Sequence, residues 1–169
     1  MPITHTHARP AARHADHGRM AGQHYLRLLV MTVLSFAAMY GLMYAMVDSL
    51  DSVYNGINQA YMAGLMAAAM VVIELAVMGA MYKNRKLNAA IIALSVLALA
   101  GCWALIRTQA AVDDRQFLRS MIPHHAGAIL MCERAAVRDP EILDLCKTIV
   151  ASQAAEIRQM KAMLAELSQ

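Results

Sequence analysis

Three long apolar runs constrain the fold of this chain more than any other feature. They cover residues 28–47, 57–81 and 87–106, and the charged residue within them is Glu74. A helix needs about 20 apolar residues to cross the roughly 30 Å hydrocarbon core of a bilayer, and each run is long enough. Hydrophobic residues make up 59% of the chain, and the mean hydropathy is +0.42. The runs therefore predict a membrane domain of three helices over residues 25–107, with the lipid bilayer as a partner.

The charges between the runs predict how the spans are oriented. The loop after the first run contains Asp48 and Asp51 and no Lys or Arg, whereas residues 83–86 of the next loop are strongly basic. Short cytoplasmic loops carry an excess of Lys and Arg. We therefore expect a multi-pass protein of the inner (plasma) membrane with a cytoplasmic N-terminus. Everything after residue 106 is then periplasmic or extracellular.

The first 24 residues are polar and lack apolar periodicity. They predict a disordered cytoplasmic tail rich in His and Arg. Short His-rich tracts can bind metal, so weak adventitious binding and a metal-collecting role both stay open. Basic residues that bind nucleic acid are interleaved with aromatic residues or carried on a folded motif. Neither pattern is present, and no nucleic-acid partner is expected. The tail holds five of the seven histidines: His5, His7, His14, His17 and His24.

Residues 108–169 have the composition of a soluble helical segment. Asp139, Pro140 and Glu141 mark a helix start, with an N-cap, a proline at the first helical position and an acid in the first turn. The segment predicts one helix over residues 113–137 and a second, antiparallel helix after the turn. No Gly or Pro lies between residues 102 and 122, so the third span is expected to continue unbroken into the first of these helices. The predicted fold is all-α, with three transmembrane helices followed by an external helical hairpin.

The hairpin carries the residues with the most distinctive chemistry. Imidazole and thioether together suit copper, especially Cu(I), better than magnesium or calcium, which prefer oxygen ligands. The second helix also presents an amide and a carboxylate that serve as weaker ligands or as hydrogen-bonding neighbours. A metal ion is therefore the expected partner. The predicted metal residues are Met121, His124, His125, Gln153, Glu156, Met160 and Met163.

The turn near Asp139 sets the expected register of the hairpin. Residues equidistant from it lie at similar height, which pairs His125 with Gln153 and Cys132 with Cys146. Adjacent residues on a helix point about 100° apart. One histidine is then a ligand and the other lies outside the site, unless a kink at Pro123 turns both toward one point.

Two further features leave alternatives open at this stage. Facing His, Gln and Glu side chains can form a buried hydrogen-bonded network without any metal. Cys132 and Cys146 can be buried thiols, a disulfide in an oxidising compartment, or thiolate ligands.

The second apolar run carries a row of soft side chains. Methionines and Glu74 recur at four-residue intervals, and such a row is either adaptable apolar filling or a path for a soft cation. An ionisable group at membrane depth is costly and calls for a polar partner. The row consists of Met62, Met66, Met70, Glu74 and Met78.

Two runs of the hairpin resemble a known family. Phe117-x3-Met121-Ile-Pro-His124-His125-x-Gly127, followed by Gln153-x2-Glu156-x3-Met160, resembles the domain-of-unknown-function family 305. The resemblance implies a ferritin-like helical bundle, copper-binding secreted and periplasmic relatives, and here a membrane-anchored subgroup. The bundle of that family has four helices. One hairpin is a half-bundle, so the resemblance also implies a homodimer.

These observations predict a membrane-anchored copper-binding protein for sequestration or tolerance of the metal at the periplasmic face. The alternative is a helical interaction or assembly module in the membrane that binds no metal. An enzyme is not expected. A di-iron oxidase on a ferritin-like bundle would need two Glu-x2-His motifs with further carboxylates, and the sequence has no Glu-x2-His.

Overall fold

The chain folds entirely from helices. In the computed structural model, which describes residues 10–168, no strand occurs among the described residues. The all-α prediction is thereby confirmed. In chain order the helices are α1 (Pro10–Leu42), the 3₁₀ helices η1 (Met43–Met46) and η2 (Leu50–Ser52), α2 (Ile57–Val77), α3 (Arg85–Thr108), α4 (Asp114–Arg134) and α5 (Pro140–Glu166).

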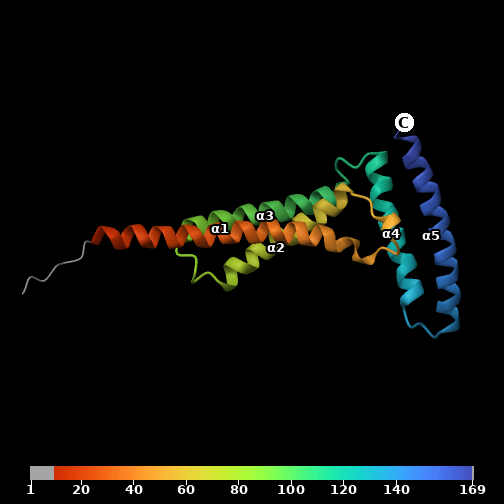
Figure 1. Ribbon diagram of the computed structural model, residues 1–169, viewed down its shortest axis with the longest axis horizontal. Coiled ribbons are helices and arrows are strands. Elements are labelled where there is room, and N and C mark those ends of the chain that lie inside the picture. Colours follow the sequence, from red (N-terminus) through yellow and green to blue (C-terminus); the bar gives the residue numbers. More distant parts are fainter. Residues whose placement is uncertain (1–9, 169) are drawn as a thin grey trace, which may run out of the picture.

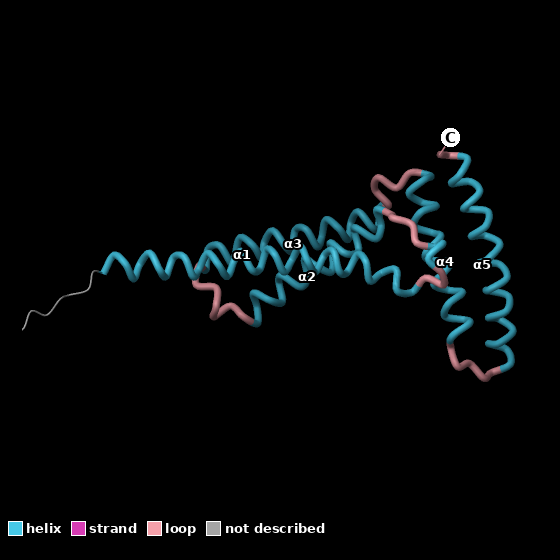
Figure 2. Tube along the Cα trace, in the orientation of Figure 1, coloured by secondary structure: helices cyan, strands magenta, loops and turns pink. Residues whose placement is uncertain are grey.

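The helices form two units of different shape. Helices α1, α2 and α3 lie side by side as an elongated rod, and α4 and α5 form an antiparallel pair across one end of it (Figure 1). The loop between α2 and α3 lies at the other end of the rod. The two connections that lead into α2 and α4 lie beside the hairpin (Figure 2). The basic loop therefore lies away from the hairpin, and the N-terminal turns of α1 extend past it (Figure 1).

The helices of the rod match the apolar runs and expose most of their apolar surface. Gly22–Met46, Ile57–Val77 and Arg85–Thr108 are each long and apolar enough to cross a membrane. Leu94 and Leu97 on α3 are each 69% exposed. The second run ends four residues earlier than expected, because a turn closes between Met78 and Met81 with a backbone hydrogen bond of 2.9 Å.

Helix α1 begins earlier than the apolar pattern suggests. It starts at Pro10, inside the segment for which the sequence predicts a disordered tail. The prediction of a disordered tail is therefore contradicted from Pro10 onward. For residues 1–9 it falls outside the described residues.

The expected continuous helix from the third span into the hairpin is wrong. Helix α3 ends at Thr108, and Gln109 (φ 52°) and Ala111 (φ 57°) adopt left-handed backbone conformations. The Gln109 side chain stabilises this end because its Nε2 donates to Ile106 O at 2.6 Å. Asp113 then starts α4, since its Oδ1 accepts from the Gln116 N–H at 2.7 Å. Capping side chains thus end one helix and start the next without Gly or Pro.

The hairpin has its own apolar core. The predicted start of its second helix is confirmed, because Asp139 Oδ1 accepts from the N–H groups of Glu141 and Ile142. Ile122 at the centre of α4 is fully buried. The core residues recur at helical spacing along the facing sides, so burial of this stripe holds the two helices together. They are Leu118, Ile122, Ala126 and Ile129 of α4 with Ile157, Met160 and Leu164 of α5.

Candidate metal centre

His125 and Glu156 form the polar contact at the centre of the hairpin. Nδ1 of His125 lies 2.9 Å from Oε2 of Glu156, and the His125 side chain is 14% exposed. Among the described residues Nδ1 makes no hydrogen bond of regular geometry, so the ring is close to the carboxylate but not aligned with it. An imidazole held beside a carboxylate in a half-buried position is a common arrangement at metal sites.

The contact also sets the register of the hairpin. The sequence predicts His125 opposite Gln153, whereas the structure places it against Glu156, about one turn further along α5. Met121 is four residues before His125, and Met160 is four residues after Glu156. Because the two helices are antiparallel, Met121 and Met160 then lie at the same height. Met160 belongs to the hairpin core and Met121 packs against that core. Two thioethers therefore lie one turn from the His125–Glu156 contact.

His124 lies on the other side of α4. The two imidazole centroids are 6.0 Å apart with an angle of 58° between the rings. His125 faces α5, whereas His124 is exposed and lines a cavity toward the rod. Helix α4 continues through Pro123 without interruption. The two histidines therefore contact different surroundings, with His125 beside Glu156 and His124 at the cavity.

Two other predicted residues lie away from this contact. Gln153 is half-buried on α5. Met163 is 43% exposed and lines a separate hollow of about 390 Å³ with Phe117 and Leu118 near the end of the hairpin. Of the seven predicted residues, the structure thus gathers Met121, His125, Glu156 and Met160 on the facing sides of the two helices.

The cavity that His124 lines has a volume of about 510 Å³ and is called here the rod-end cavity. It lies between α4, η1 and the first turns of α2. Its thioethers come from Met43, Met46, Met62, Met121 and Met131. Met121 is the one residue of these that sequence reasoning placed in a site. The methionine row of the second apolar run included Met62, but the sequence does not show that this residue lies near α4.

No group of three or more His, Cys, Asp or Glu side chains in the described part of the chain is arranged to hold a metal ion. A metal bound at the His125–Glu156 contact or in the rod-end cavity would therefore need ligands besides His, Cys, Asp and Glu, and methionine sulfur is present at both. Thioether sulfur is a soft ligand that selects Cu(I) over harder cations. The donor set at both places therefore combines imidazole and thioether groups with a few oxygen atoms.

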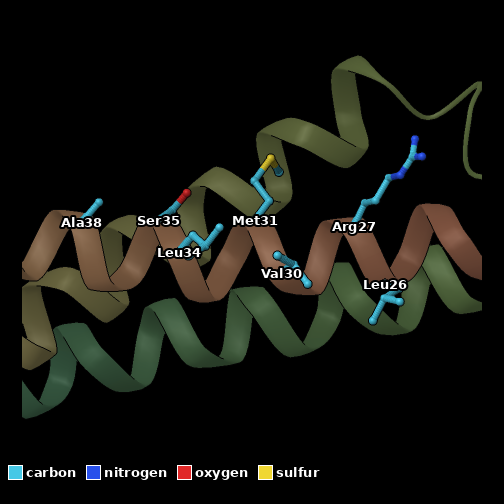
Figure 3. Close-up of a pocket in the computed structure, with 7 residues that line it drawn as sticks. All are labelled: Leu26, Arg27, Val30, Met31, Leu34, Ser35 and Ala38. Atoms are coloured by element: carbon cyan, nitrogen blue, oxygen red, sulfur yellow. The ribbon is translucent and has the colours of Figure 1, made fainter.

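Other candidate positions have simpler explanations. Tyr82 donates a hydrogen bond of 3.4 Å to Glu74 Oε1, which provides the polar partner that the carboxyl group requires. A hollow of about 540 Å³ runs along α1, and its apolar lining with Arg27 at one end offers no converging polar groups (Figure 3). All its lining residues come from α1, so it is a shallow surface feature of one helix.

The three cysteines are free thiols. Cys132 and Cys146 are neighbours across the hairpin near its turn, and a hydrogen bond between the two thiols raises the pKa of Cys132 above its ordinary value. The disulfide considered from the sequence is thus not formed here, although the pair is close together.

Comparison with known proteins places the chain in a family. The model for a domain of unknown function (DUF305) matches residues 78–164, which include α3 and nearly all of the hairpin. The chain belongs to the DUF305 family. A relative of this DUF305 protein is the uncharacterized protein L153 of Acanthamoeba polyphaga mimivirus. The two are 34% identical over 142 residues, which cover 82% of this chain and 91% of the relative. No solved structure matches the chain.

Proposed function

We propose that this DUF305 protein is a membrane-anchored metal-binding protein whose hairpin binds copper as Cu(I). The observation that carries the proposal is the contact of 2.9 Å between His125 Nδ1 and Glu156 Oε2, one turn from Met121 and Met160. A carboxylate beside one ring nitrogen favours the tautomer with its proton there. The Nε2 lone pair of His125 is then available for a metal.

The residues present fit a soft metal better than a hard one. Glu156 is the carboxylate beside His125, and magnesium and calcium sites need several oxygen ligands. Imidazole with two thioethers matches Cu(I). The proposed role is sequestration or tolerance of copper by binding rather than catalysis.

The rod is proposed to be the membrane anchor. Soluble proteins rarely expose contiguous apolar patches larger than a few hundred Å². Exposed leucines and valines run along α1, α2 and α3, which lipid would cover. The basic 83–86 loop lies away from the hairpin, and with the positive-inside rule this supports the proposal of a periplasmic or extracellular hairpin.

A homodimer is proposed to complete the hairpin as a four-helix bundle. Helix α5 packs against α4 and leaves apolar side chains outward, with Leu145 56% and Ile142 47% exposed. A second hairpin would cover this face. The same exposed face supports the alternative function, an assembly module that binds a helical partner and no metal.

Competition for Cu(I) tests the proposed function. The full chain in mild detergent is titrated against a chromophoric Cu(I) chelator under anaerobic conditions. Because His125→Ala removes a nitrogen ligand, it should weaken the hairpin site by at least about tenfold, and Glu156→Gln should cost about 10- to 100-fold through loss of the orienting carboxylate. His24→Ala, a change of the same kind at the far end of the rod, is the matched control. Equal affinity of parent and His125→Ala at every bound equivalent would overturn the assignment.

A further inference from the structure

Helix α4 and the rod meet closely at the rod-end cavity. A Cβ atom added at Gly127 would lie 3.4 Å from the carbonyl oxygen of Met46, an ordinary van der Waals distance, so η1 packs directly on α4 here. Gln116 Oε1 accepts a hydrogen bond of 3.0 Å from the Ile57 N–H. The cavity walls are therefore held by direct contacts between hairpin and rod.

From these walls we infer that the rod-end cavity is a second binding site for a soft monovalent cation of the Cu(I) class. Its donors are the imidazole of His124 and the five thioethers of the cavity. Met43, Met46 and Met62 belong to η1 and α2, so the rod itself supplies ligands. This inference rests on the proposed function and deepens it, because Met121 borders both the cavity and the hairpin core.

Buried oxygen atoms in the cavity wall favour a polar occupant. Gln59 is 8% exposed, and its Oε1 accepts no hydrogen bond from any described residue. The same holds for Asn58 Oδ1 and Ser120 Oγ, which also belong to lining residues. Leaving a buried polar atom unpaired is destabilising. These oxygens are covered and make the wall behind the thioethers polar, which suits an ion better than a lipid chain.

The charge of the cavity wall restricts the occupant further. No Asp, Glu, Lys or Arg is among its lining residues. Magnesium and calcium sites use several oxygen ligands, carboxylates among them, and the amide oxygens of Asn58 and Gln59 carry no charge to balance a divalent ion. Uncharged thioethers and imidazole bind Cu(I) without a carboxylate. Met46, Met62 and Met131 remain partly exposed, so an ion can reach the donors from the surface.

The test measures Cu(I) stoichiometry and methionine methyl NMR signals on the full chain in detergent micelles. The chain carries ¹³C-methyl methionine and is titrated anaerobically with Cu(I). The site variant replaces Met43, Met46 and Met62 by Leu, which conserves volume. The control variant replaces Met39 at the end of α1, and Met66 and Met70 of α2, by Leu, because none of these three methionines lines the cavity. His125→Ala reports on the hairpin site.

Two bound equivalents are expected in the parent, with shifts of the Met43, Met46 and Met62 methyl signals in the second step. The site variant should lose one equivalent, and the control variant should lose none. An unchanged stoichiometry and affinity in the site variant would overturn the inference and leave the proposed function standing. Binding that the site variant abolishes and His125→Ala does not affect would support the cavity and overturn the hairpin site.

The parent chain provides a check that does not depend on how the variants fold. If its Met43, Met46 and Met62 methyl signals stay unshifted at saturating Cu(I), the inference is overturned. The same conclusion follows if they respond to added phospholipid and not to Cu(I), because the cavity would then be a lipid contact.

Discussion

The backbone N–H of Ile57 donates a hydrogen bond of 3.0 Å to Oε1 of Gln116. Ile57 is the first residue of α2 and Gln116 lies in the first turn of α4, so a side chain of the hairpin caps a helix of the rod. The first N–H groups of a helix have no partner within it. This bond therefore stabilises α2 and fixes the hairpin on the rod at the same time.

Replacing Gln116 by Ala should weaken both roles. Loss of a capping bond of this kind costs about 0.5–2 kcal/mol. Thermal unfolding of the detergent-solubilised chain, followed by circular dichroism, should show a lower midpoint. Gln159→Ala, at an exposed position of α5, is the matched control and should leave the midpoint nearly unchanged. A midpoint for Gln116→Ala equal to that of the control would show that the bond contributes nothing.

The thiol pair of the hairpin should respond to pH and to oxidants. The hydrogen bond with Cys146, together with burial, raises the pKa of Cys132, so the thiolate forms at higher pH than in an ordinary cysteine. Alkylation of Cys132 should therefore be slow near neutral pH and rise at alkaline pH. In Cys146→Ala the rise should move to lower pH. Mass spectrometry of the alkylated peptide measures the rate, and identical pH profiles would contradict the bond between the thiols.

A mild disulfide-forming oxidant should join Cys132 to Cys146 within one chain. Two thiols lose two protons and two electrons, which the oxidant accepts. Cys102 lies on α3 in the rod and should stay reduced. Peptide mapping identifies the product. A Cys102 disulfide formed at the same rate would argue against the selective proximity of the pair.

The exposed face of α5 should lie at the homodimer interface. With the native cysteines replaced by Ala, Leu145→Cys should be trapped as a disulfide-linked dimer in membranes. Cysteine at Leu94, an exposed position of the rod, is the matched control and should cross-link less. A chain that is monomeric in several detergents and still binds Cu(I) would remove the dimer and leave a self-contained hairpin.

The orientation of the rod can be read with reporter fusions. A reporter active only outside the cytoplasm should be active after Gln169 and silent within residues 83–86, because positive loops stay in the cytoplasm. The reverse pattern would place the hairpin and both proposed metal sites in the cytoplasm.

Local signals made the helices predictable from the sequence. The apolar runs depend on composition alone, and Asp139 with Pro140 marks the start of α5 through capping chemistry that acts within a few residues. The end of α3 was missed because Gln109 adopts a left-handed conformation that sequence patterns associate with glycine.

Features set by packing were predictable only in part. The sequence singled out both histidines and the methionines of the hairpin, and four of the seven predicted residues do gather there. It could not place His125 against Glu156 rather than Gln153, because the burial of Ile122 and Ile157 sets the register. The rod-end cavity could not be predicted from the sequence for a similar reason. Met43, Met62 and Met131 meet only after the hairpin packs on the rod.

The position of α5 has a mechanical consequence. In the chain α5 packs chiefly on α4, and α4 in turn contacts η1, η2 and α2. A displacement of α5 would therefore be transmitted to the rod chiefly through α4. Helix α4 thus couples the outer helix of the hairpin to the three apolar helices.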